Sequence, residues 1–270
     1  MSISLVVTVK AYPAISQKHG EAVCVAGIRT DSEPRWVRLW PVYFRDLPFS
    51  QRFQKYQEIH LDVQRSSDTR PESVRPLTDT LVTGKTIGAA NAWARRRRLV
   101  EPLVVESMCE VSERQQRDKT SLGIFRPGEV QDLIIESDAA DWDPKHQAVI
   151  AQPSLFAPQK KGLTKVPYRF KFRYRCTTAG CGGHEQSIVD WEIAQAFLGW
   201  TQFPVDERLK RIRDRWLGDL CGPARDTHFY VGNQHQHPGS FLILGVFWPP
   251  KPSESKVAEV KQEQLQIDLA

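Results

Sequence analysis

Residues 168–184 read YRFKFRYRCTTAGCGGH, and this stretch holds the clearest regular pattern of the chain. Its first eight residues alternate strictly between aromatic and basic side chains. Because successive side chains of a strand point to opposite faces, we expect an amphipathic strand with rings on one face and cations on the other. Like charges in one row repel each other, so either acids of the fold or phosphates should neutralise them. The cation row consists of Arg169, Lys171, Arg173 and Arg175.

The predicted strand leads into a cluster of cysteine and histidine. Cys176 and Cys181 are spaced as C-x4-C, and His184 follows three residues later, with glycines that allow a tight turn. Thiolates and imidazole are the ligands of tetrahedral structural zinc, and we take Cys221 as the fourth ligand because it follows the next helix but one. The sequence therefore predicts a zinc site. The alternative is a pair of buried thiols with a capping histidine.

An enzymatic interpretation of the same region uses its acidic side chains. We expect a helix over residues 186–200. If the helix already includes Glu185, then Glu185 and Glu192 lie nearly in line, because they are seven residues apart. Asp190 would lie well round the helix from Glu192, which makes a shared site difficult. The alternative is that these acids stabilise the helix N-terminus and pair with the cation row.

Two histidines near the C-terminus are further candidates for catalysis. His235 and His237 lie between apolar runs at 227–233 and 240–248, which we expect to form a hairpin. An H-x-H pair can bind a metal, but the Pro-Gly pair that follows indicates an exposed turn. The catalytic candidates, for a metal-dependent nuclease or phosphoesterase, are Glu185, Asp190, Glu192, His235 and His237.

Several common enzyme motifs are absent from the sequence. TGKT at 83–86 would need a glycine at position 79 to form a P-loop, and that position is Asp79. The sequence has no G-x-G-x-x-G, no G-x-S-x-G and no H-E-x-x-H, and it does not match the zinc deaminase pattern. These motifs therefore do not support a P-loop, dinucleotide, α/β-hydrolase, metalloprotease or deaminase function.

The N-terminal part is rich in short strands. We expect strands at 3–10, 21–29, 35–40 and 58–65, followed by a loop over 66–84. Four strands joined by short turns predict a small antiparallel barrel or a strongly curved sheet.

The strand at 35–40, RWVRLW, carries a candidate nucleic-acid contact. If Val37 and Leu39 face the core, then Trp36, Arg38 and Trp40 form an outward stripe of the kind that stacks on bases. In the opposite register the two tryptophans are buried, as large aromatic side chains usually are.

A predicted helix over 86–100 ends in a basic run. Its four adjacent arginines point around the whole helix, so at least two of them must meet solvent or an anion. They can stabilise the helix C-terminus or contact phosphates. These residues are Arg95, Arg96, Arg97 and Arg98.

These elements predict an α+β protein with a β-rich first module and an α+β second module. The second module contains the Cys/His knuckle, helices over 186–200 and 206–220, and the terminal hairpin. The predicted divisions are a β-rich module (1–80), a basic helical and mixed connecting segment (81–156), the α+β module (157–250) and a polar flexible tail (251–270).

Composition points to an acidic partner. The 270 residues carry a formal net charge of +5, with a pI near 9.0, and include eight Trp and twelve Phe. Residues 3–9 are too short an apolar run for a signal peptide, and five cysteines do not suit a disulfide framework, so we expect a cytoplasmic protein. We therefore predict a protein that binds DNA or RNA and contains zinc, with a nuclease or a non-catalytic interaction subunit as alternatives. The sequence leaves open whether it is an enzyme.

Overall fold

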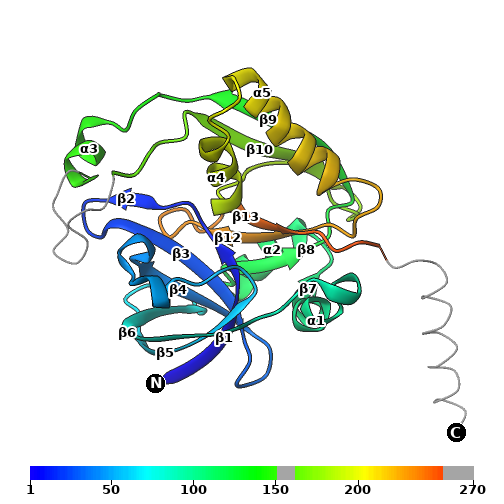
Figure 1. The fold of residues 1–270 in the computed structure, drawn as a ribbon. Helices are drawn as coiled ribbons and strands as arrows, with labels where there is room; N and C mark the ends of the chain where they lie inside the picture. Colours follow the sequence, from blue (N-terminus) through cyan, green and yellow to red (C-terminus); the bar gives the residue numbers. More distant parts are fainter. Residues whose placement is uncertain (151–161, 252–270) are drawn as a thin grey trace, which may run out of the picture.

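The computed structural model describes residues 1–150 and 162–251 and shows a mixed α+β fold with three sheets (Figure 1). This confirms the predicted fold class. The largest sheet has six strands in the order β1-β5-β6-β4-β3-β2. These strands are β1 (Ser2–Lys10), β2 (Ala14–Ser16), β3 (Gly20–Arg29), β4 (Trp36–Val42), β5 (Gln57–Arg65) and β6 (Ser73–Thr86).

The N-terminal strands pair in a ring, because β1 pairs with β3 as well as with β5. Most of these pairings are antiparallel, but β4 and β6 pair in parallel over a short stretch, so the expectation of a purely antiparallel sheet is wrong. The predicted loop over 66–84 is also wrong in its second half. There β6 hydrogen-bonds along β5, and its mostly polar, partly exposed side chains gave no apolar alternation to identify it.

The second half of the chain forms the two smaller sheets. One has the order β11-β10-β9 and the other the order β13-β12-β8-β7. Figure 1 shows β12 and β13 between the N-terminal strands and the part that contains β9 and β10. The strands are β7 (Val104–Val105), β8 (Leu122–Phe125), β9 (Glu129–Ser137), β10 (Tyr168–Arg175), β11 (His184–Ser187), β12 (His228–Asn233) and β13 (Phe241–Phe247).

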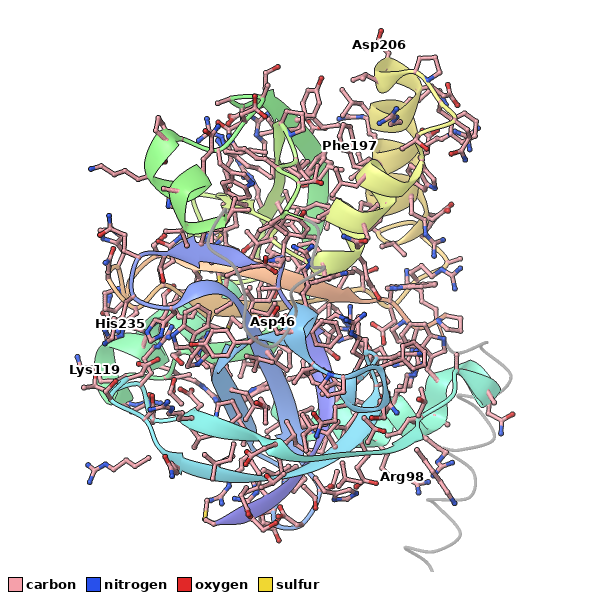
Figure 2. The ribbon with its side chains drawn as sticks, turned by 60° about the vertical axis from the view of Figure 1, so that its left-hand side comes forward. Asp46, Arg98, Lys119, Phe197, Asp206 and His235 are labelled. Atoms are coloured by element: carbon pink, nitrogen blue, oxygen red, sulfur yellow. The ribbon has the colours of Figure 1, made fainter. Side chains whose placement is uncertain are left out.

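Five α-helices of the described residues surround these sheets, and none of them is long and apolar enough to cross a membrane. Helices α4 and α5 lie beside β9 and β10 (Figure 1), and Figure 2 shows Phe197 on the side of α4 that faces the interior. The helices are α1 (Ala90–Val100), α2 (Met108–Asp118), α3 (Pro144–Ile150), α4 (Trp191–Gly199) and α5 (Val205–Arg213). Short helical turns are η1 (Phe44–Asp46), η2 (Phe49–Gln51), η3 (Glu101–Leu103) and the π-helical η4 (Asp214–Asp219).

The helix predicted over 186–200 begins later than expected. Residues 184–187 form β11 instead, and Asp190 is the N-cap of α4, accepting a hydrogen bond from the backbone N–H of Glu192 at 3.1 Å. An N-cap has extended rather than helical dihedral angles, so the predicted angle between Asp190 and Glu192 around the helix does not apply. The predicted flexible tail lies almost entirely outside the described residues, as do the first residues of the predicted α+β module, up to 161.

The predicted alternation in β10 is present. Phe170, Phe172 and Tyr174 are buried in the C-terminal core, whereas Arg169 and Arg173 are exposed on the other face. In β1 and β3, by contrast, both faces are buried. Leu5 and Val7 belong to the core inside the N-terminal sheet, while Val6 and the neighbouring Ile28 pack against side chains of the second half.

A cluster of charged side chains around the buried Asp190 lies where the N-terminal sheet meets α4. The Lys55 ammonium is 3.2 Å from a Glu192 carboxylate oxygen and 3.5 Å from Asp190. The Lys10 ammonium lies 4.0 Å from the centroid of the Phe44 ring and 4.8 Å from that of Trp191. Burial lowers the pKa of Lys10 from 10.5 to about 8, although the nearby carboxylates oppose this shift. The charged form of Lys10 therefore destabilises the folded protein.

We expect Lys10→Met to stabilise the protein at pH 7 and to lose this advantage as the pH rises. Below about pH 8 the lysine is charged in both states and the folded state bears the full desolvation penalty. Between about pH 8 and 10.5 the unfolded chain binds more protons, so the wild type gains stability relative to the variant. Chemical unfolding of both proteins across this range measures the difference. A difference that does not change with pH would contradict the assignment.

Candidate metal centre and central cleft

Four metal-ligand side chains from distant parts of the chain converge at one end of β10. They are Cys109, Cys176, Cys181 and His184, and their ligand atoms all lie within 4.8 Å of one another. His184 Nε2 lies 3.3 Å from the Sγ atoms of Cys176 and Cys181, and 3.7 Å from Cys109 Sγ. Ordinary Zn–S and Zn–N lengths in a tetrahedron place sulfur and nitrogen about 3.6 Å apart. The group is therefore close enough to bind a metal ion.

A tight turn after β10 brings three of these ligands together. Cys176 follows the last residue of β10, and the chain then bends through Gly180 (φ +77°) and Gly183 (φ +92°). These left-handed angles are accessible to glycine without strain. The backbone N–H of Cys176 donates to Cys181 Sγ at 3.4 Å, which favours a thiolate at Cys181. The predicted knuckle residues Cys176, Cys181 and His184 thus lie together.

The fourth ligand position is taken by Cys109, whereas the sequence favoured Cys221. Cys109 lies in the first turn of α2, where the Ser107 hydroxyl accepts a hydrogen bond from the N–H of Glu110 at 3.1 Å. Burial raises the pKa of the Cys176 thiol, and backbone N–H groups at this helix end oppose that rise. Cys221 instead follows η4 and packs against the C-terminal core, outside the group. The correction has a simple reason: β8 and β9 fold back to bring α2 beside β10, and no local spacing encodes this.

The four protein ligands leave no open position for a substrate in a tetrahedral site, which is typical of structural rather than catalytic zinc. Burial raises the pKa of the Cys109 thiol to about 12 and lowers the pKa of His184. Tyr174 stacks on the His184 ring with centroids 5.1 Å apart, which fixes the imidazole. A bound ion would displace the thiol protons, so its affinity would rise with pH.

A large cleft of about 1300 Å³ lies between the N-terminal sheet and the second half of the chain. Among the described residues, its lining includes seven lysines and arginines but only three acids. Two of the acids are already paired, Asp68 with Arg70 at 2.5 Å and Asp138 with Lys165 at 3.3 Å. The third, Asp190, faces Lys55. The cleft therefore has an excess of positive charge.

Four cations of the cleft are exposed and have no ion pair among residues 1–150 and 162–251. Lys18 and Arg75 lie near His19, whose pKa is lowered by burial and by these two charges. Arg65 lies at the end of β5, and Arg169 lies on β10. The unpaired cations are Lys18, Arg65, Arg75 and Arg169.

The predicted stripe on β4 is divided between three environments. Val37 and Leu39 face the N-terminal core as expected, but the second half of the chain covers most of the opposite face. Trp36 packs against Tyr230, with ring centroids 6.0 Å apart. Trp40 lines the cleft and is only half-buried.

Arg38, the middle residue of the stripe, is not an outward-facing phosphate contact. It is 2% exposed, and its guanidinium donates to the carbonyl oxygen of Ser121 at 2.7 Å and to the Ser121 hydroxyl at 3.1 Å. The sequence could not indicate this, because Ser121 lies 83 residues further along the chain and meets Arg38 only when the second half packs on β4.

The basic run of α1 has two packed and two exposed members. The Arg96 guanidinium lies 4.0 Å from the centroid of the Tyr56 ring, and Arg97 pairs with Asp226 at 2.7 Å. Arg95 and Arg98 are exposed, and Figure 2 shows Arg98 at the edge of the molecule. This agrees with the expectation that at least two of the four meet solvent.

The cation row of β10 is partly neutralised by acids of its own sheet. Lys171 pairs with Glu136 at 2.7 Å, and Arg173 pairs with Glu185 at 2.7 Å. Arg169 and Arg175 have no ion pair among the residues that the structure describes. Two of the four predicted phosphate contacts, Lys171 and Arg173, therefore already have an acidic partner within the sheet.

The five catalytic candidates occupy different surroundings. Glu185 is paired across the sheet. Asp190 and Glu192 both reach Lys55, although the expected helix made a shared site difficult. His235 lies 3.3 Å from Asp68 at the cleft. His237 is exposed in the hairpin loop. The only group of three or more metal-ligand side chains found within the described ranges is the Cys/His centre.

Comparison with known proteins shows the family of the chain. Residues 104–266 match the family described as Domain of unknown function (DUF8757), and the chain belongs to it. Residues 1–102 match a second family, Domain of unknown function (DUF8758). No curated protein matches. A structure described as murine DNA binding protein bound with ds DNA is 9% identical with a TM-score of 0.30, covering 94% of this chain and 97% of that chain, a likeness too low to support an argument.

We expect purified protein to contain about one metal ion per chain and Cys109→Ser to lose it. Cys221→Ser is the matched control, because it removes a half-buried thiol outside the group and should retain the ion. Elemental mass spectrometry on untagged protein, purified without chelators, measures the content. Loss in Cys221→Ser with retention in Cys109→Ser would reverse the assignment.

Proposed function

We propose that this chain binds nucleic acid in the central cleft and that its Cys/His centre holds a structural zinc ion. The observation that supports binding most directly is the set of four exposed, unpaired cations around a cleft of about 1300 Å³. Phosphates are the natural partners of such cations, and nucleic acid supplies them in a regular row.

The distribution of charge supports this proposal more strongly than the net charge does. Where the N-terminal sheet meets α4, Lys55 contacts two carboxylates. In the cleft, burial and the charges of Lys18 and Arg75 lower the pKa of His19, and no described acid pairs with either cation. Like charges that line the same cleft repel each other unless an anion binds between them.

Zinc is the metal that best fits the donor set. Three thiolates and one imidazole at tetrahedral spacing form an ordinary structural zinc site. Its residues would connect the end of β10 to α2, two segments that are far apart in the sequence. The ion would stabilise the second module and take no part in chemistry.

If the cleft is the binding site, affinity should depend on two arginines that lie on its two sides. Arg75→Gln combined with Arg169→Gln should weaken binding of an oligonucleotide of about 16 nucleotides. The plot of log K against log salt concentration should become less steep by roughly 0.7 for each phosphate of a single strand that the protein no longer neutralises, or 0.9 for B-DNA. Fluorescence anisotropy at several salt concentrations measures both quantities.

Arg35→Gln is the matched control for charge. Arg35 is exposed at the opposite end of β4 from Trp40 and does not line the cleft. If Arg35→Gln reduced affinity and salt dependence as much as a single cleft substitution does, binding would follow net charge, and the cleft would not be the site.

A further inference from the structure

We propose that the cleft accepts an unpaired, single-stranded segment, with at least one base stacked against an aromatic wall formed by His19, Trp40 and Tyr43. This inference rests on the proposed function and adds the structural form of the nucleic acid. The cations of the cleft attract any polyanion. Aromatic rings that remain accessible in the cleft distinguish nucleic acids with unpaired bases from those whose bases are paired and stacked.

The rings of the wall are only partly covered by contacts within the protein. Trp40 is half-buried at the cleft and meets His19 edge to face, with ring centroids 5.8 Å apart and planes at 79°. Tyr43 is 39% exposed and is one of the few large side chains with apolar surface exposed among the described residues. An edge-to-face neighbour leaves ring faces free for another planar group.

An unpaired base suits this wall and a paired base does not. In a duplex the faces of the bases are covered by stacking on their neighbours, and only base edges and phosphates are available to a protein. In a single strand each base can turn its face to an aromatic side chain while the backbone follows the cations. The wall and the cations of the cleft together therefore match a single strand.

The arrangement of the cations favours a chain of nucleotides over a free mononucleotide. Lys18 and Arg75 lie on the N-terminal side near the wall, while Arg169 approaches from β10 on the other side. A mononucleotide carries its phosphates at one point, but a strand passes phosphates along both sides. The volume of about 1300 Å³ also exceeds the roughly 300–1,000 Å³ of ordinary small-ligand pockets.

The test compares nucleic acids of one length against the same set of variants. Labelled oligo-dT and oligo-U of about 16 nucleotides, and a hairpin duplex of the same length, are titrated by fluorescence anisotropy, with AMP and UMP as competitors. The variants are Trp40→Leu and Tyr43→Ala. Phe49→Ala is the matched control, because Phe49 is 90% exposed and does not line the cleft.

We expect both single strands to bind more tightly than the hairpin and to resist competition by the mononucleotides. Each wall substitution should weaken single-strand binding about five- to 150-fold, the equivalent of ~1–3 kcal/mol per stacked base, and leave hairpin binding unchanged. Phe49→Ala should bind like the wild type. Tyr43→Ala keeps the test valid if Trp40→Leu does not fold, since Tyr43 is the more exposed of the two side chains and circular dichroism reports the fold.

Different outcomes of this experiment would overturn this inference and the proposed function. Equal binding of hairpin and single strand, unaffected by the wall substitutions but weakened by the two cleft arginine substitutions, would overturn the inference and leave nucleic-acid binding in the cleft intact. Competition by a mononucleotide at equal affinity would also overturn it, by showing a nucleotide site. Absence of binding to all these nucleic acids would overturn both proposals.

Discussion

Burial of both faces of the N-terminal strands is the constraint on which the rest of the structure depends. Leu5 and Val7 fill the interior of the N-terminal sheet, so Val6 and Ile28 on the other face need a second apolar layer. The second half of the chain supplies that layer with Tyr230 and neighbouring side chains. Leaving such side chains in water would forfeit roughly 1.5–3 kcal/mol each, so the two halves are held in one arrangement. The cleft forms where this shared core ends.

The shared core also explains why charges behave differently in different places. Arg38 lies beneath the covering module, and there Ser121 accepts from its guanidinium and donates to Glu72 at 2.7 Å, so that the buried cation is linked to a carboxylate through a hydroxyl. A buried charge without such partners would be strongly unfavourable. In the cleft, where side chains reach solvent, the same requirement is absent, and Arg75 and Arg169 remain unpaired within the described ranges. Positive charge therefore collects in the part of the molecule that a ligand can enter.

Local patterns in the sequence identify the elements, and contacts between distant elements determine the sites. Strict alternation identifies β10, and the C-x4-C spacing with His184 identifies three of the four metal-site residues. Cys109 has only a weak local signal, a Ser-x-x-Glu pattern that places it in the first turn of a helix. Its proximity to Cys176 depends on the path of β8 and β9. The cleft is likewise beyond any local pattern, because its two sides come from halves of the chain that are far apart in the sequence.

One strand connects the two sites. Arg169, near the start of β10, lines the cleft, and Cys176 follows the last residue of the same strand at the Cys/His centre. Between them Phe170, Phe172 and Tyr174 are buried, so β10 cannot slide without exposing three aromatic side chains. A metal ion bound to Cys176 and to Cys109 of α2 would restrain one end of this strand. The position of Arg169 at the other end would then be fixed by packing along β10. In this way a bound metal ion would influence the geometry of the cleft without any direct contact with it.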